Sequence, residues 1–110
     1  MPFSREPWES PESSLEAADY CAVCLIDTNE SGAEKVKARC KLPLRKTPGG
    51  PYNVNAIHAA AGAHGILGVK GVSPDEKRKA ARKLVSLYKE IDEQAPDSTY
   101  HMAGMKPPSS

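Results

Sequence analysis

Apolar residues recur at spacings of three and four between positions 80 and 91, and they give the clearest helix signal in the chain. The expected buried stripe is Ala80, Leu84, Leu87, Tyr88 and Ile91, which share one face of an α-helix. Ser73 suits the N-cap, Pro74 suits the first helical position, and Glu76 completes a capping box. The pattern predicts a helix over about 74–93.

Two short apolar runs precede this helix and predict a small β-ribbon. Residues 22–27 (AVCLID) have the apolar and β-branched character of a short buried strand. Residues 41–45 (KLPLR) should be extended, because Pro43 disfavours the helical conformation of the residue before it. We expect the two segments to pair. A pair of strands is marginal alone, so it requires a helix packed on it.

Weaker patterns indicate two more helices. Ser13 or Ser14 can begin a short helix, with Glu16 completing a capping box and Leu15 in the buried stripe. An Ala-rich helix is expected over 56–63, and either Asn53 or Asn55 can be its N-cap. The basic segment 33–41 is only weakly helical in character.

Length and composition limit the architecture. The chain has 110 residues, which suits one small domain, and its 10 prolines and 8 glycines argue against a large sheet sandwich. We predict a small single α+β domain, mostly α, with two or three helices packed on a short extended pair. Residues 1–12 are expected to form an extended arm, 13–94 the globular domain and 95–110 a mobile tail. No apolar run reaches 18 residues, so no membrane span is expected.

Trp8 is the only tryptophan of the chain, and it lies in the proline-rich N-terminal arm. Its large apolar face favours burial. Two interpretations stay open: Trp8 covers the core of its own domain, or it anchors the arm on a neighbouring subunit.

Charge is distributed unevenly along the chain. Residues 1–34 hold eight acidic residues and one basic residue, whereas 35–89 hold thirteen basic residues and two acidic ones. Four residues of the predicted last helix are candidates for partner binding: Lys77, Arg78, Arg82 and Lys83. They could bind an acidic protein surface or DNA, the chain's own acidic arm could neutralise them, or they could form a solvated helix face.

The three cysteines allow two interpretations. Their odd number, without a secretory signal in the first eleven residues, predicts a reduced cytosolic chain without disulfides. Alternatively, the ligand set Cys21, Cys24, Cys40 and His58 has the chemistry of a structural zinc site. A strand over 22–27 argues against zinc, because it would place Cys21 and Cys24 on opposite faces. No cofactor is therefore expected, with zinc kept as the alternative.

Catalytic patterns are weak. A histidine–cysteine pair requires a cleft and an orienting group, and so small a chain with few bulky residues favours a structural role for His58. Glycines 62, 65, 68 and 71 follow a helix and do not match a phosphate-binding loop. We therefore expect a protein that is not an enzyme.

Three short motifs follow one another in this chain and precede the basic helix. They are CLID with Leu25 and Asp27, KLPL with Leu42 and Pro43, and NVNAIHAAA with Asn53, Asn55 and His58. From Trp8 to Tyr88 the chain resembles a small module of tailed-bacteriophage structural gene clusters, which occurs alone or fused to prohead-protease-like head-assembly proteins. The resemblance implies that these motif residues specify the fold.

The resemblance further implies a non-enzymatic structural protein. It would be a capsid decoration or minor head protein, or a head-assembly factor, in the virion or in the host cytoplasm during assembly. Its partners would be capsid or other head proteins, and it would be oligomeric or bound to a lattice. The alternatives are a nucleic-acid-binding phage regulator that uses helix 74–93 and a zinc-stapled interaction domain.

Overall fold

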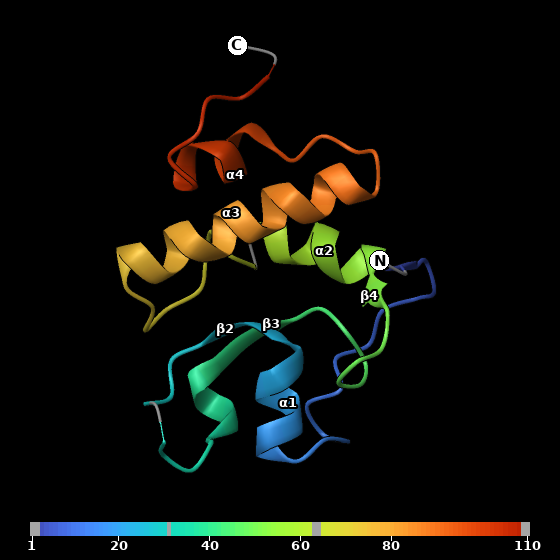
Figure 1. The fold of residues 1–110 in the computed structure, drawn as a ribbon, viewed down its shortest axis with the longest axis vertical. Coiled ribbons are helices and arrows are strands. Elements are labelled where there is room, and N and C mark those ends of the chain that lie inside the picture. The colour runs from blue at the N-terminus through green and yellow to red at the C-terminus, as the bar shows by residue number, and fades with distance from the viewer. Residues whose placement is uncertain (1–2, 31, 63–64, 109–110) are drawn as a thin grey trace.

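A two-stranded ribbon divides the molecule into two parts (Figure 1). The computed structural model describes residues 3–30, 32–62 and 65–108. Strands β2 (Cys24–Asp27) and β3 (Cys40–Pro43) are antiparallel, with Ile26 opposite Lys41. This pairing of the two apolar runs confirms the predicted ribbon. Helix α1 (Ala17–Val23) and the 3₁₀ turn η1 (Lys37–Arg39) lie on one side of it, and the remaining helices lie on the other.

The long helix α3 (Pro74–Glu90) forms as the capping residues and the apolar spacing predict. The Ser73 side chain accepts a hydrogen bond of 3.2 Å from the backbone N–H of Glu76. Ala80, Leu84, Leu87 and Tyr88 are buried, and Ala81 and Val85 widen the stripe. The helix ends three residues earlier than expected, and Asp92 then adopts a left-handed conformation with φ of 56°.

Helix α2 (Val54–Ala61) begins directly after Asn53, whose side-chain oxygen accepts a 3.0 Å hydrogen bond from the N–H of Ala56. Of the two candidate caps, Asn53 is therefore the N-cap. The helix ends at Ala61, so the predicted end at 63 is not reached within the described residues. Residues 63–64 lie outside them.

The capping box expected at Ser13 or Ser14 does not form. The Ser14 hydroxyl instead donates to the carbonyl of Pro11, which also accepts the backbone N–H groups of Ser14 and Leu15. These bonds close a turn, and α1 begins only at Ala17, where Glu16 provides no side-chain cap. The Ser14 side chain thus stabilises the turn before α1 and does not cap the helix. Residues 22 and 23, which were predicted to begin a strand, are the last two residues of this helix.

Segments near both ends of the described chain pack on the domain. Strand β1 (Phe3–Ser4) pairs in parallel with β4 (Tyr52–Asn53). In place of the mobile tail expected over 95–110, helix α4 (Asp97–Met102) lies on α3. Its Tyr100 side chain is only 5% exposed. Helix α4 is held by tertiary packing, which local sequence patterns do not report.

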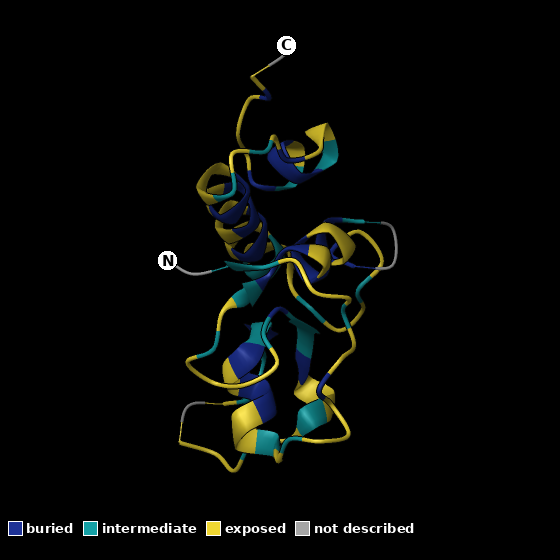
Figure 2. Cartoon of the chain, turned by 90° about the vertical axis from the view of Figure 1, so that its right-hand side faces the viewer, coloured by how far each residue is buried: buried dark blue, intermediate teal, exposed yellow. Residues whose placement is uncertain are grey.

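Most of the buried apolar residues form two clusters. The larger cluster lies between α2, α3, α4 and the ribbon, and it includes Ile26, Leu44, Ile57 and Leu84. The smaller cluster lies between α1 and β3 and holds Tyr20, Cys21, Val23 and Cys40. Figure 2 shows both, with the buried faces of the helices turned inward. This arrangement is a small single α+β domain. None of the described helices has the length and apolar character that crossing a bilayer requires.

Candidate functional site

The strongest surface feature is a basic face on α3. Residues 78, 79, 82 and 83 stand at relative positions 0, 1, 4 and 5, so they form two adjacent rows on the side opposite the buried stripe. All four are exposed. We call Arg78, Lys79, Arg82 and Lys83 the basic face. Lys77, the remaining candidate for partner binding, is half-buried and precedes the buried Ala80, Ala81 and Leu84 by three, four and seven residues, so it lies on the core side of α3 and not on the basic face.

Two residues of the basic face also have contacts within the chain. The Nε of Arg82 donates a 3.0 Å hydrogen bond to the carbonyl of Ala103, next to the end of α4. The Nζ of Lys83 lies 5.8 Å from the ring centroid of Tyr52, and the guanidinium carbon of Arg45 lies 5.2 Å from the same ring. These are cation–π distances. Arg82 and Lys83 thus help to hold the fold, which the charge pattern alone did not indicate.

Arg78 and Lys79 differ from them. Both side chains are exposed, and neither forms an ion pair or a side-chain hydrogen bond with any of the described residues. Helix α3 is 17 residues long and packs on α2, α4 and β2, so it presents these two charges on a rigid support.

Trp8 lies on its own domain. It is partly buried against the larger core cluster. The groove around it is formed by Leu42, Pro43, Ala56, Ala59, Ala60 and Gly65. The interpretation in which Trp8 covers its own core therefore describes this structure.

The resemblance motifs position backbone and core rather than reactive groups. Leu25 and Leu42 pack against the larger cluster, and Leu42 has a positive φ of 62°. Asn53 and Asn55 both donate side-chain N–H hydrogen bonds to the carbonyl of Glu6, at 3.0 and 2.8 Å. The two asparagines of NVNA thus hold the N-terminal arm.

His58 is part of a polar pair at the surface. Its Nε2 lies 2.6 Å from Oε1 of Glu93, and the other oxygen of Glu93 lies 3.6 Å from the guanidinium of Arg5. The imidazole stacks on the ring of Tyr88, with centroids 5.7 Å apart. Burial, and then the charge of Glu93, raise the pKa of the Tyr88 hydroxyl. His58 thereby links α2 to the segment after α3.

A disulfide between Cys21 and Cys40 overturns the prediction of a chain without disulfides. The two residues are 19 positions apart in sequence, and the bond joins α1 to β3. The alternative zinc set is not assembled either. Two of its sulfurs are bonded to each other, and His58 contacts Glu93. The prediction failed because it was drawn from the odd number of cysteines and the missing secretory signal, and neither reports that α1 and β3 bring Cys21 and Cys40 together.

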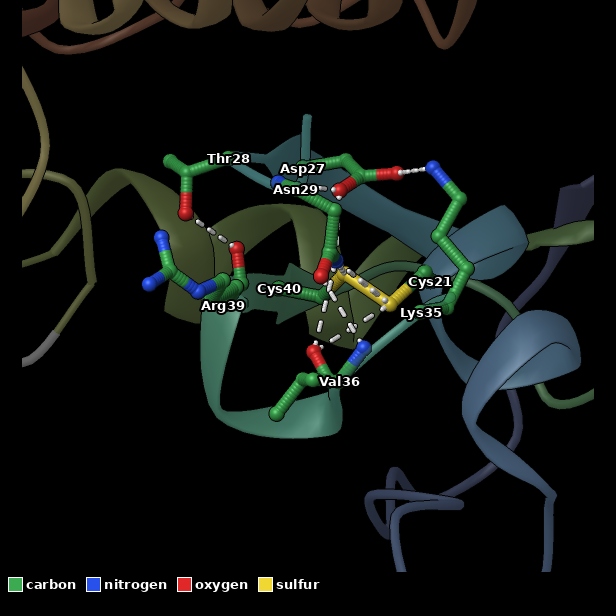
Figure 3. Close-up of polar contacts among 8 residues, drawn as sticks. All are labelled: Cys21, Asp27, Thr28, Asn29, Lys35, Val36, Arg39 and Cys40. Atoms are coloured by element: carbon green, nitrogen blue, oxygen red, sulfur yellow. Dashed lines mark hydrogen bonds and ion pairs between the residues drawn. A yellow bond between two sulfur atoms is a disulfide. The ribbon is translucent and has the colours of Figure 1, made fainter. Parts of the chain in front are cut away.

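A polar network surrounds the disulfide (Figure 3). Asn29 Nδ2 lies 2.8 Å from Asp27 Oδ1 and 3.3 Å from the sulfur of Cys40, and Asn29 Oδ1 accepts the N–H of Val36. Lys35 Nζ binds the other oxygen of Asp27 at 2.6 Å. Burial alone would raise the pKa of Asp27, but the hydrogen bonds from Lys35 and Asn29 outweigh it, so this pKa lies below its ordinary value.

The remaining cysteine, Cys24, is a free thiol that is half-buried. Burial raises its pKa to about 11, and the hydrogen bond from Tyr20 offsets this only in part. A thiol with so high a pKa is almost wholly protonated at neutral pH, and the protonated form is a poor nucleophile.

Sequence reasoning had named Asp27 but missed its partners Asn29 and Lys35. The spacing Asp27-Thr28-Asn29 carried a usable signal, because aspartate often accepts the N–H two residues on, as it does here at 2.9 Å. Lys35 had no such signal. Its contact with Asp27 depends on the three-dimensional course of the chain, in which the next residue, Val36, donates its N–H to Asn29.

Comparison with protein-family models, with curated proteins and with solved structures found no match for this chain.

Proposed function

We propose that this chain is a non-enzymatic docking protein whose basic face binds an acidic surface on a partner protein. The observation that carries the proposal is the pair Arg78 and Lys79, which is exposed and unpaired among the described residues on a helix held by its neighbours. Because the helix backbone is already ordered, binding restricts only the two side chains, and their charges can both steer and orient a partner.

The surroundings of this face favour a protein partner over DNA. Asp75 and Glu76 lie in the first turn of α3, directly beside the basic residues. These carboxylates confine the positive potential to a small area, and Arg82 is partly engaged with Ala103. Few cations are then left for the many phosphate contacts that DNA binding requires. Among the described residues, the large exposed apolar side chains are Val36, Leu67 and Met105. The described surface thus offers no strongly exposed aromatic side chain on which bases could stack.

The state of the candidate reactive groups supports a role without catalysis. Cys21 and Cys40 are bonded to each other, and the Cys24 thiol is protonated at neutral pH. The histidine of the resemblance motif, His58, is engaged with Glu93 and Tyr88. The motif residues pack in the core, cap a helix or hydrogen-bond to the backbone of the arm, and these are structural roles.

The resemblance to phage structural modules supplies the context of the proposal. The partner is then a capsid protein or another head protein, and the chain is a decoration protein, a minor head protein or a head-assembly factor. An acidic partner surface is the chemical requirement that the basic face adds to this context.

Mass spectrometry of purified virions tests the proposal. We expect the wild-type chain to co-purify with particles, and the double variant Arg78→Glu/Lys79→Glu to be depleted at least about tenfold. The matched control Lys70→Glu/Lys106→Glu reverses two exposed lysines outside α3 and should be retained. Unchanged incorporation of the Arg78/Lys79 variant would refute the role of this face. Salt-sensitive binding of the wild type to duplex DNA, lost in the same variant, would favour the nucleic-acid alternative.

A further inference from the structure

The N-terminal arm lies in a groove that recognises extended backbone. Phe3 and Ser4 pair in parallel with Tyr52 and Asn53, and the ring centroids of Phe3 and Tyr52 are 6.1 Å apart. This is the geometry in which a peptide adds a strand to an exposed edge.

Side chains of the domain then hold the next residues by their carbonyl groups. Asn53 Nδ2 and Asn55 Nδ2 both donate to the carbonyl of Glu6, and Asn55 also reaches the carbonyl of Arg5 at 3.3 Å. Trp8 follows in the apolar groove between β3 and α2. The groove thus combines backbone capture with one aromatic anchor, and a tryptophan is a common anchor at protein interfaces.

Few strong contacts hold the N-terminal arm in this groove. Its strand is only two residues long. Its ion pairs, Arg5 with Glu93 at 3.6 Å and Glu6 with Lys46 at 3.9 Å, involve largely exposed arm side chains, and pairs of this kind contribute little. Residues 9 and 10 are exposed and join the arm to Pro11, which is buried. This junction offers a hinge without breaking any helix.

We propose that the groove accepts the N-terminal arm of a second copy of this chain, so that neighbouring copies exchange arms. Every contact made within one chain is then remade between two chains, as in domain swapping. A short tether gives the chain's own arm an effective concentration in the millimolar range. Exchange is therefore expected where copies are concentrated side by side. This inference does not depend on the basic face or on its partner.

A peptide of residues 1–12 added to the full-length Trp8→Ala variant tests the groove. The variant contains no tryptophan, so tryptophan fluorescence, excited selectively over tyrosine, reports only the peptide. We expect a saturable blue shift of the peptide emission. Adding Asn55→Ala should weaken binding about fivefold, because its carboxamide donates to the arm backbone. Adding Gln94→Ala, at an exposed amide outside the groove, should leave binding unchanged. A folded variant that does not bind the peptide would overturn the proposal.

A second measurement applies if circular dichroism shows that Trp8→Ala does not fold. Wild-type chain with a nitroxide on its N-terminal amine is mixed at millimolar concentration with ¹⁵N-labelled wild-type chain. Exchange predicts intermolecular broadening of the amide signals of residues 52–55, increasing with concentration. Absence of this broadening at millimolar concentration would overturn the proposal.

Discussion

Asp27 shows how one residue can organise a loop. Its carboxylate accepts from Asn29 through one oxygen and from Lys35 through the other. Asn29 continues the connection to Val36 and to the sulfur of Cys40. The loop between β2 and β3 is thus closed by side chains as well as by the disulfide, and one carboxylate lies at the centre of the network.

The pH dependence of stability should reveal this role. Because the folded-state pKa of Asp27 lies below the unfolded value of about 3.9, the carboxylate stabilises the fold above about pH 4. That stabilisation is lost as the pH falls through the folded-state pKa. We expect Asp27→Asn to lower the free energy of unfolding by about 1–2 kcal/mol at pH 7. The difference from the wild type should shrink below pH 4, as measured by urea unfolding at each pH.

Glu30→Gln provides the control for this measurement, because Glu30 is an exposed acid of the same loop without an ion pair among the described residues. Its unfolding curve should follow that of the wild type at every pH. A constant difference between Asp27→Asn and the wild type from pH 3 to 7 would contradict the assigned role of the charge.

At the scale of elements, the sequence predicted what local chemistry determines. Ser73 and Pro74 begin α3, and its apolar spacing fixes the buried face. The apolar runs likewise predicted the ribbon. The extended conformation that Pro43 was expected to impose on Leu42 is wrong, because Leu42 has a positive φ of 62°. Elements that depend on distant contacts were missed: α4 is held by packing on α3. Helix α1 was misplaced because the Ser14 hydroxyl binds the carbonyl of Pro11.

In the candidate site, too, features set by local spacing were predicted and features set by distant contacts were missed. Spacing on one helix was enough to predict the exposed basic residues, of which Arg78 and Lys79 are unengaged within the described chain. Spacing could not show that Arg82 binds the carbonyl of Ala103, or that Lys83 lies over Tyr52. It also could not pair Cys21 with Cys40, because that pairing depends on where α1 ends.

The disulfide stabilises an element that has little core of its own. The cluster beside α1 contains four buried residues, and two of them are the bonded cysteines. Closing a segment of this length reduces the entropy of the unfolded chain by an amount worth about 3 kcal/mol. We expect Cys21→Ser/Cys40→Ser to lose about this much in urea unfolding, and the reduced wild type to lose a similar amount.

Cys24→Ala leaves the bond in place and is the matched control for these measurements. It should lose less than about 1.5 kcal/mol, as expected for a small change at a half-buried side chain, and it should still respond to reductant. Equal stability of the oxidised and reduced wild type would show that the bond does not stabilise the fold.

At the scale of the whole molecule, the N-terminal arm and α4 pack on the same core. Trp8 of the arm and Tyr100 of α4 both pack with the larger cluster, although 92 positions separate them in sequence. A core of this size, with few aromatic residues, cannot lose one of its large side chains without weakening the whole.

The structure therefore predicts that a change in α4 unfolds the arm as well. Tyr100→Ala should lower the free energy of unfolding by about 3–5 kcal/mol, because it leaves a cavity at a side chain that is only 5% exposed. The loss of helix content, followed by circular dichroism, and the change in Trp8 fluorescence should both occur at lower urea concentration than in the wild type, since both depend on the same cluster. Tyr100→Phe keeps the ring and should stay within about 1 kcal/mol of the wild type. In the opposite outcome, Tyr100→Ala would lose its helix content at lower urea than the wild type, but its Trp8 fluorescence would still change at the wild-type urea concentration. The arm and α4 would then unfold independently of each other.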